Sequence, residues 1–261
     1  MVSISVVNIK GGVGKTTSVV NIAACLALYN HKRVIVVDTD AQTNASTYLM
    51  TNQSKTADAK TVIDVLRGGK VSECISTASF KSRGEEISID LLQSNIDVDK
   101  EEIKDIGILR KAMVEVAEKY DYCLYDCPPH LSNLALTAMC ASDYVLVPAL
   151  PDSDSMSGYS QLIDAVNMIR TNTDNTSLEI LGIFINAIAK NDALDKYITG
   201  SLKDGLKKTL FTQMLRRSTI AKQCRFFGEP ICIKARSSDL SEDYRTLTNQ
   251  IVSRIKNKRG E

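Results

Sequence analysis

The sequence predicts an α/β protein in which a mainly parallel, twisted sheet has helices on both faces. Short apolar runs rich in β-branched residues alternate along the chain with stretches of helical period. Glycines, carboxylates and amides directly follow several of these runs, and parallel sheets bind ligands at the carboxyl ends of their strands. Hydrophobic residues make up 44% of the 261 residues, which is ample for a core. We expect residues 1–261 to form a single domain.

The expected strands are short and buried, and the expected helices lie between or after them. The strands are residues 3–8, 34–38, 87–91, 122–126, 144–148 and 178–186. The first helix runs from residue 18 onward, and the others are residues 61–67, 107–119, 132–140, 155–170, 194–207, 220–226 and 239–256. Residues 51–60 and 81–86 are polar and predict an irregular insert and a turn.

A glycine-rich segment joins the first strand to the first helix. Residues 10–17 read K-G-G-V-G-K-T-T. Glycines let backbone N–H groups converge on phosphate oxygens, and the helix dipole adds to the attraction. The strict pattern G-x-x-x-x-G-K-[ST] is not met, because Ile9 stands at its first glycine. We still predict a phosphate site here, formed by Gly11, Gly12, Val13, Gly14, Lys15, Thr16 and Thr17.

Carboxylates at two strand ends would complete this site. Lys15 would reach the β- and γ-phosphates, and the Thr16 hydroxyl would bind Mg²⁺. Asp126 ends the run Y-C-L-Y-D and suits a magnesium ligand, directly or through water. Asp40 follows the run V-I-V-V-D-T and could orient the water that attacks the γ-phosphate, with Asp38 supporting it from behind. A helix cap or a turn is the alternative role for each acid.

Other polar residues near strand ends have weaker claims. Asn186 ends the run G-I-F-I-N, and its amide could bind a purine edge or only shape a turn. His130 is expected to be a solvent-facing residue rather than an acid or base, because phosphoryl transfer needs little proton-transfer chemistry. Cys127 is expected to pack in the core rather than act as a nucleophile.

The cysteines and the distribution of charge give expectations about the compartment of the protein and about a polyanionic partner. The seven cysteines form no C-x-x-C pair and lie mostly in apolar contexts, so we expect reduced thiols and a cytoplasmic protein. No apolar run is long enough to cross a membrane, and the first strand leaves no room for a signal peptide. Residues 190–261 contain 16 Lys or Arg against 8 Asp or Glu, whereas the whole chain has a net charge of +1. This asymmetry fits either a polyanion-binding face or solvated helix surfaces.

Together these motifs resemble the ParA family of partition ATPases, in the deviant P-loop group that also contains MinD and the nitrogenase iron protein. The resemblance covers nearly the whole chain. Residues 10–17 match the family's loop in full, residues 38–42 match D-x-D-P-Q except for Ala41, and residues 126–129 match D-C-P-P. Residues 158–162, 182–186 and 227–231 resemble the G-x-S-Q-L, G-x-x-x-N and x-G-x-P-I segments.

The resemblance implies an ATPase that uses ATP and Mg²⁺ and forms an ATP-dependent homodimer. Lys10 would cross to the partner's nucleotide and stabilise phosphate charge, as an arginine finger does. The dimer would bind nonspecific DNA, and a ParB-type centromere-binding protein would stimulate hydrolysis and so release it. Such cycles position plasmids or chromosome origins, so we expect a nucleoid-associated protein. Residues 214–216 stand where the family often has I-P-R, which would place Leu215 near the nucleotide.

The resemblance and the basic C-terminal third together indicate a surface for DNA. The candidate contacts are cationic and form two clusters, of which the one from Arg216 to Arg225 also has Phe226 and Phe227. They are Lys203, Lys207, Lys208, Arg216, Arg217, Lys222 and Arg225. Their contacts with phosphates would be sensitive to salt and independent of DNA sequence. No helix–turn–helix segment precedes Lys10, so we do not expect operator recognition.

Four other functions are possible for the same superfamily. A MinD-like membrane-bound ATPase needs an amphipathic tail, whereas Tyr244, Leu247, Ile251 and Ile255 predict a narrow stripe that packs in the core. An amide-forming ligase would need a substrate pocket, and an iron protein would need bridging cysteines in glycine-rich settings. A ParA relative could also position another cell cargo on the nucleoid.

Overall fold

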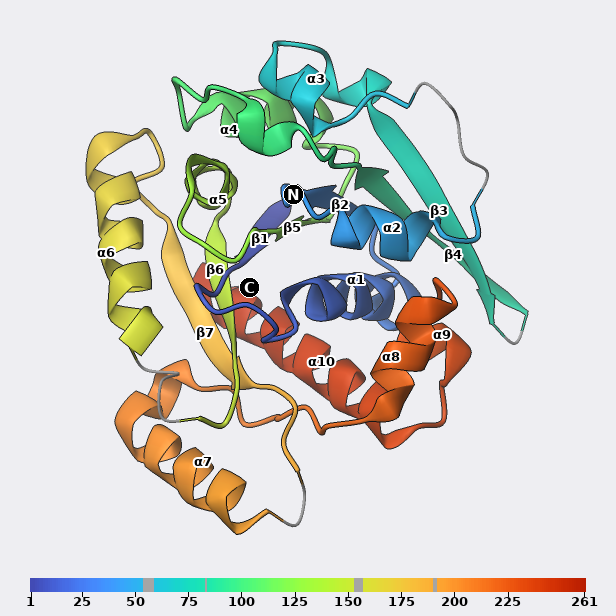
Figure 1. Ribbon diagram of the computed structural model, residues 1–261, viewed down its shortest axis with the longest axis vertical. Coiled ribbons are helices and arrows are strands. Elements are labelled where there is room, and N and C mark those ends of the chain that lie inside the picture. The colour runs from blue at the N-terminus through green and yellow to red at the C-terminus, as the bar shows by residue number, and fades with distance from the viewer. Residues whose placement is uncertain (54–58, 83, 153–156, 190–191) are drawn as a thin grey trace.

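The computed structural model describes residues 1–53, 59–82, 84–152, 157–189 and 192–261, and it confirms the predicted α/β class. Seven strands form one sheet in the order β3-β4-β2-β5-β1-β6-β7 (Figure 1). All neighbouring strands are parallel except β3 and β4. The strands are β1 (Val2–Val6), β2 (Val34–Asp38), β3 (Ile75–Ser82), β4 (Glu85–Leu92), β5 (Tyr122–Asp126), β6 (Tyr144–Ala149) and β7 (Glu179–Ile185).

Helices cover both faces of the sheet (Figure 1). The first face carries α1 (Lys15–Asn30), α2 (Asn44–Met50), α8 (Thr219–Phe226), α9 (Ile231–Lys234) and α10 (Asp239–Arg259). The second carries α3 (Val62–Leu66), α4 (Ile108–Met113), α5 (Asn133–Cys140), α6 (Ser157–Asn172) and α7 (Ala193–Leu206). Short 3-10 helices lie at Val71–Glu73, Val98–Lys100, Val114–Val116 and Lys207–Thr209.

The core has two halves because successive strand residues point to opposite faces. On β2, Val34 and Val36 pack with the first set of helices, whereas Ile35 and Val37 pack with the second. The α10 stripe of Tyr244, Leu247, Ile251 and Ile255 is buried in the first half, as the sequence predicted. At about 25 cal/mol per Å² of apolar surface, such burial is the main term that holds these layers together.

The structure differs from the expected secondary structure in several segments. Residues 75–82 form β3, a strand that the sequence analysis missed; its burial alternates because only one face is covered. Residues 107–119 do not form one helix: α4 ends at Met113 and a 3-10 turn, Val114–Val116, follows. Residues 44–50, which were not expected to be helical, form α2 directly after the Asp38–Asp40 motif. No helix within the described residues is both long and apolar enough to cross a bilayer.

Candidate functional site

The loop between β1 and α1 is shaped by glycines. Gly12 and Gly14 have φ of 74° and 90°, a region that residues with a Cβ rarely adopt. Gly14 is also the residue before the first turn of α1, and no side chain caps that helix. The first turn of α1 contains no acidic residue. The free N–H groups and the helix dipole therefore favour an anion at this end of α1.

Lys15 lies folded back against this loop. Its Nζ donates to the carbonyl oxygens of Asn8 and Lys10, each at 3.1 Å. Burial lowers the pKa of Lys15, and the nearby Asp126 carboxylate opposes that shift. Asn8 fixes the start of the loop, because its amide donates to the carbonyl of Pro148 and accepts from the N–H of Lys10. Asn8 was not among the predicted site residues, although its amide follows a buried strand and could have indicated a contact with the loop.

Asp126 lies at the centre of the site with its carboxylate unpaired. Strand β5 runs between β1 and β2, so Asp126 is in register with Val6 on one side and Asp38 on the other. Asp126 is fully buried, and neither carboxylate oxygen has a hydrogen-bond partner among the described residues. Burial, followed by the charge of Asp38, raises the pKa of Asp126 well above its ordinary value. A buried carboxylate with no partner is unfavourable unless a cation joins it.

The residues at this point fit a magnesium ion that a nucleotide would bring. Mg²⁺ is commonly held by one or two protein carboxylates together with phosphate oxygens. Within the described residues no cluster of three or more His, Cys, Asp or Glu could hold a metal without such help. The N–H and hydroxyl of Thr39 both donate to the carbonyl of Asp126, at 3.0 and 2.8 Å, and so fix its backbone.

Asp38 and Asp40 have different surroundings. Asp38 accepts hydrogen bonds from the N–H and hydroxyl of Ser46, at 2.8 and 2.7 Å, and from the N–H of Asp40 at 3.1 Å. Burial raises the pKa of Asp38 to about 6 even though these bonds favour the charged form. The Asp40 carboxylate accepts a hydrogen bond from the N–H of Gln42 at 3.0 Å. Asp38 therefore fixes the backbone of this segment, and Asp40 keeps capacity for another partner.

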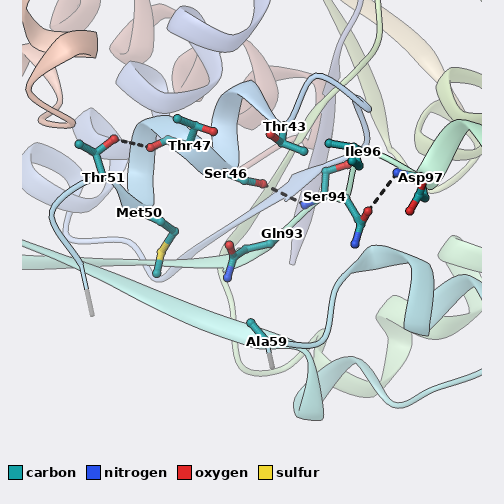
Figure 2. Close-up of a pocket in the computed structure, with 11 residues that line it drawn as sticks. Thr43, Ser46, Thr47, Met50, Thr51, Ala59, Gln93, Ser94, Ile96 and Asp97 are labelled. Atoms are coloured by element: carbon teal, nitrogen blue, oxygen red, sulfur yellow. Dashed lines mark hydrogen bonds between the residues drawn. The ribbon is translucent and has the colours of Figure 1, made fainter. Parts of the chain in front are cut away.

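A pocket of about 570 Å³ lies behind this segment (Figure 2). Residues of α2 form one wall and the chain after β4 forms another. The N–H of Ser94 donates to the Ser46 hydroxyl at 2.9 Å, and that hydroxyl donates to Asp38. The pocket is thus separated from the buried acids by one serine. Its lining is Thr43, Ser46, Thr47, Met50, Thr51, Ala59, Gln93, Ser94, Asn95, Ile96 and Asp97.

Asn186 touches the glycine-rich loop from β7. Its amide nitrogen donates to the carbonyl of Val13 at 2.7 Å, and its amide oxygen accepts from the N–H of Ala187 at 2.8 Å. A Cβ on Gly14 would lie 2.2 Å from that nitrogen, so the contact itself requires glycine at position 14. Asn186 is close to the loop as the prediction requires, but its amide closes the loop here, and a purine contact stays a prediction.

Two other predicted residues lie differently from the expectation. Leu215 is fully buried, its N–H donates to the carbonyl of Ile185, and its carbonyl accepts from Ile188. It therefore offers a nucleotide neither a side-chain surface nor a free backbone group. Lys10 pairs with Asp152 of its own chain, with Nζ 2.9 Å from the carboxylate. Reaching a partner's nucleotide would require Lys10 to exchange that ion pair.

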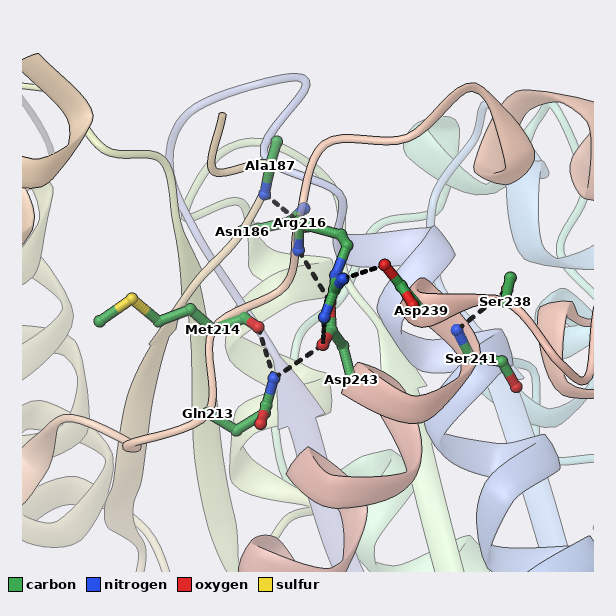
Figure 3. Close-up of polar contacts among 9 residues, drawn as sticks. All are labelled: Asn186, Ala187, Gln213, Met214, Arg216, Ser238, Asp239, Ser241 and Asp243. Atoms are coloured by element: carbon green, nitrogen blue, oxygen red, sulfur yellow. Dashed lines mark hydrogen bonds and ion pairs between the residues drawn. The ribbon is translucent and has the colours of Figure 1, made fainter. Parts of the chain in front are cut away.

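The Arg216 side chain is partly exposed, and its guanidinium is paired with two acids of α10. Its guanidinium makes two bonds to Asp243, at 2.7 and 2.8 Å, and pairs with Asp239 at the start of α10 (Figure 3). Asp243 is buried and also accepts from the amide of Gln213. A DNA contact by Arg216 stays a prediction, and it would require the guanidinium to share or exchange these ion pairs.

The remaining basic candidates are distributed over two regions. Arg217 and Lys222 are exposed, at the start of and within the α8 region, and Lys208 is exposed in the 3-10 turn after α7. Arg225 is also exposed, but its guanidinium donates to the side-chain oxygen of Asn44 at 2.7 Å. The side chains of Lys203 and Lys207 lie outside the described part of the chain. A role for any of these residues in DNA binding stays a prediction.

Comparison with known proteins places the chain among partition proteins. The family AAA_31, described as an AAA domain, matches residues 1–180. The sporulation initiation inhibitor protein Soj of Bacillus subtilis is 29% identical over 259 residues, which cover 96% of this chain and 98% of Soj. The chromosome partitioning protein ParA of Myxococcus xanthus is 28% identical over 253 residues, which cover 96% of this chain and 88% of ParA.

Solved structures share the fold at lower identity. A plasmid partition protein from Borrelia burgdorferi superposes with a TM-score of 0.74 and 19% identity, covering 97% of this chain and 98% of the other. Cobyrinic acid a,c-diamide synthase from Mycobacterium smegmatis, with bound ADP and magnesium, has a TM-score of 0.78 and 22% identity. That match covers 100% of this chain and 96% of the other. These identities establish a common fold and leave the activity to be argued from the site.

Proposed function

Because the chain belongs to the AAA domain family, among the Soj- and ParA-type partition proteins, we propose that it is an ATP-dependent DNA partition ATPase. The resemblance that the motifs predicted is thereby confirmed. In this proposal residues 1–261 bind ATP and Mg²⁺, dimerise around the nucleotide and bind nonspecific DNA. Hydrolysis, stimulated by a ParB-type partner, releases the DNA and so positions a plasmid or chromosome.

The observation that carries the proposal is the unpartnered, buried carboxylate of Asp126 beside the glycine-rich loop. Burying an ionised carboxylate without a partner costs free energy, and a bound cation would supply that partner. Asp126 and the Thr16 hydroxyl would hold Mg²⁺, which when bound neutralises phosphate charge. The same cation would lower the pKa of Asp126, so that the buried carboxyl ionises as magnesium and nucleotide enter.

The chain's own residues would then position and polarise the γ-phosphate. The backbone N–H groups at the start of α1 bind phosphate oxygens, and Lys15 leaves its two loop carbonyls to contact the β- and γ-phosphates. Asp40 orients the attacking water while Asp38 holds the backbone on which Asp40 lies. Lys10, once released from Asp152, stabilises charge in the partner's site.

A MinD-like membrane role remains the alternative, together with positioning of another cargo on the nucleoid. The stripe that would have to insert into lipid is buried against α1 instead, since Tyr244, Leu247, Ile251 and Ile255 all lie in the core. This burial favours DNA over a membrane as the surface to which the dimer binds.

The decisive experiment measures phosphate release with ATP and Mg²⁺, with and without duplex DNA, beside DNA affinity in ATP and in ADP. We expect DNA to bind much more tightly with ATP than with ADP, and the affinity to fall as salt rises. Lys15→Ala should abolish nucleotide binding and with it DNA binding. Asp40→Ala should bind ATP, lose hydrolysis and stay on DNA.

Three results would point elsewhere. DNA affinity that is equal in ATP and ADP would contradict partition by a nucleotide cycle. Liposome pelleting that depends on residues 256–261 would favour the MinD-like role. ATP consumption that requires a carboxylate substrate and an amine donor would favour an amide-forming ligase.

A further inference from the structure

Helix α8 is attached to the segment that leaves the Asp38–Asp40 motif. Asn44 is the first residue of α2, four positions after Asp40, and its side-chain oxygen accepts from the guanidinium of Arg225 at 2.7 Å. Arg225 lies in the last turn of α8. The end of a basic helix is thus bonded to the beginning of the helix that Asp40 precedes.

Two more contacts join α2 and the turn that follows it to the turn after α8. The side-chain amide of Asn52 donates to the carbonyl of Phe227, and the hydroxyl of Tyr48 donates to the carbonyl of Glu229 at 3.3 Å. The turn between them is tight: Gly228 has φ of 63°, and a Cβ there would lie 2.4 Å from Thr51. Figure 1 shows α2, α8 and α9 beside one another at one edge of the first face.

The same turn is tied to the phosphate-loop helix by a buried residue. The side chain of Asn21, in α1, accepts from the N–H of Ile231 and donates to the carbonyl of Thr17, both at 2.7 Å. Asn21 and Ile231 are fully buried, whereas Asn44 and Arg225 lie nearer the surface. A buried hydrogen bond is costly to break, and an exposed one exchanges readily with water. The Asn44–Arg225 bond is therefore easier to break than the bond between Asn21 and Ile231.

The backbone at the start of α2 connects Asp40 to Asn44 through a strained residue. Thr43, between Asp40 and Asn44, has φ of 50°, a strained conformation for a β-branched residue. Its N–H donates to the carbonyl of Asp40. A shift of Asp40 toward a γ-phosphate would therefore pull on the first turn of α2 and on its contact with Arg225.

We propose that the Asn44–Arg225 contact is a latch that couples the nucleotide site to the basic helix α8. Arg225 then reports nucleotide state to α8, instead of serving as one more phosphate contact beside Arg217 and Lys222. The inference rests on the proposed function, because it assumes ATP at the loop and DNA at the basic helix. The proposed latch couples the ATP site to the basic helix through contacts within one subunit.

Affinity for duplex DNA, measured in ATP and in ADP for matched variants, tests the latch. Asn44→Ala and Arg225→Lys should lower the ratio of the two affinities by about two- to tenfold, the worth of one hydrogen bond. The variant carrying both substitutions should lower it no further, because both act on one contact. Lys222→Ala, the matched control on the same helix, should weaken binding in both nucleotides by the same factor.

An independent readout needs no DNA. Hydrogen exchange of the α8 amides should change when ATP and Mg²⁺ are added to the wild-type protein, and Asn44→Ala should remove that change. Unchanged exchange in wild-type protein that binds a fluorescent ATP analogue would overturn the latch alone. Failure to bind that analogue would overturn the proposed function and the latch together. An affinity ratio that Asn44→Ala leaves intact would make Arg225 an ordinary basic residue.

Discussion

At the scale of single residues, Asp126 is a carboxyl whose burial disfavours its charged form. The carboxyl is buried, unpartnered and next to Asp38. The folded chain therefore keeps a proton on Asp126 at a pH where the unfolded chain has lost it. The free energy of unfolding must decrease as pH rises from about 4, the ordinary value, toward the raised pKa of the folded state. Burial raises the pKa of Asp38 to about 6, so this residue also lowers the free energy of unfolding as pH rises from about 4 to about 6.

Asp126→Asn should therefore stabilise the nucleotide-free protein. At about pH 8 we expect its free energy of unfolding to exceed that of the wild type, because the substitution removes a carboxyl whose pKa burial raises in the folded state. The difference should shrink as pH falls and should level off below about 4, where the wild-type carboxyl is protonated in both states. Urea unfolding at several pH values measures it.

The same variant should lose the stabilisation that Mg²⁺ and ATP give to the wild type. Equal unfolding curves for the two proteins at every pH would show that the carboxyl carries no strained charge. Asp38→Asn is a useful comparison, because it also removes a buried acid but breaks the bonds that Ser46 and Asp40 donate.

At the scale of elements, the basic residues differ in role between the segment after the 3-10 helix Lys207–Thr209 and helix α8. Residues 210–217 run beside β7, with bridges from Ile183 to Leu210 and from Ile188 to Arg216. This register turns Arg216 toward the acids of α10, while Arg217 remains exposed. Adjacent arginines in an extended segment point to opposite sides, so one serves the fold and the other faces solvent.

Substitutions at Arg216 should consequently affect mainly stability, and substitutions at Arg217 and Lys222 should affect mainly DNA binding. Arg216→Ala leaves the buried Asp243 short of its main partner and should cost about 2 kcal/mol of unfolding free energy. Replacing Arg217 and Lys222 together by Glu should change stability by less than about 0.5 kcal/mol. That double variant should bind duplex DNA more weakly and with a smaller salt slope. Unchanged DNA affinity in it would remove α8 from the DNA surface.

At the scale of the whole molecule, Lys10 connects the fold to assembly. In one subunit the lysine pairs with Asp152, in the chain after β6, and so lies at the carboxyl end of the sheet beside the loop. A dimer around the nucleotide would replace that exposed pair, which is worth about 1 kcal/mol or less, with contacts to phosphate charge. The exchange is therefore energetically easy.

Lys10→Ala should leave ATP affinity largely intact while weakening hydrolysis and the closed dimer. Light scattering with ATP and Mg²⁺ measures the dimer, and nucleotide titration measures the affinity. Lys15→Ala is the control that fails at the binding step itself. Full wild-type turnover by Lys10→Ala would contradict a role across the subunit interface.

The sequence predicted those parts of the fold that depend on local pattern. Strands β2 and β5 were predicted to their observed bounds, because buried parallel strands are continuous apolar runs that end at a carboxylate. Strand β3 was missed because I-S-T-A-S-F-K-S has few large apolar residues, and pairing with β4 decides its conformation. Helix α2 was missed because N-A-S-T-Y-L-M is short and partly polar, and the core holds it through Tyr48 and Leu49.

By itself, the sequence determined a glycine-rich loop between a strand and a helix, and two strand ends that carry acids. Those features are set by neighbours along the chain, through glycine conformation, periodicity and turn residues. Only the tertiary structure decided that β5 lies beside β2, so that Asp126 and Asp38 share one buried charge site. It also decided that Arg216 pairs with Asp243 and that Arg225 reaches Asn44. These contacts join residues far apart in sequence, and packing of the whole chain selects them.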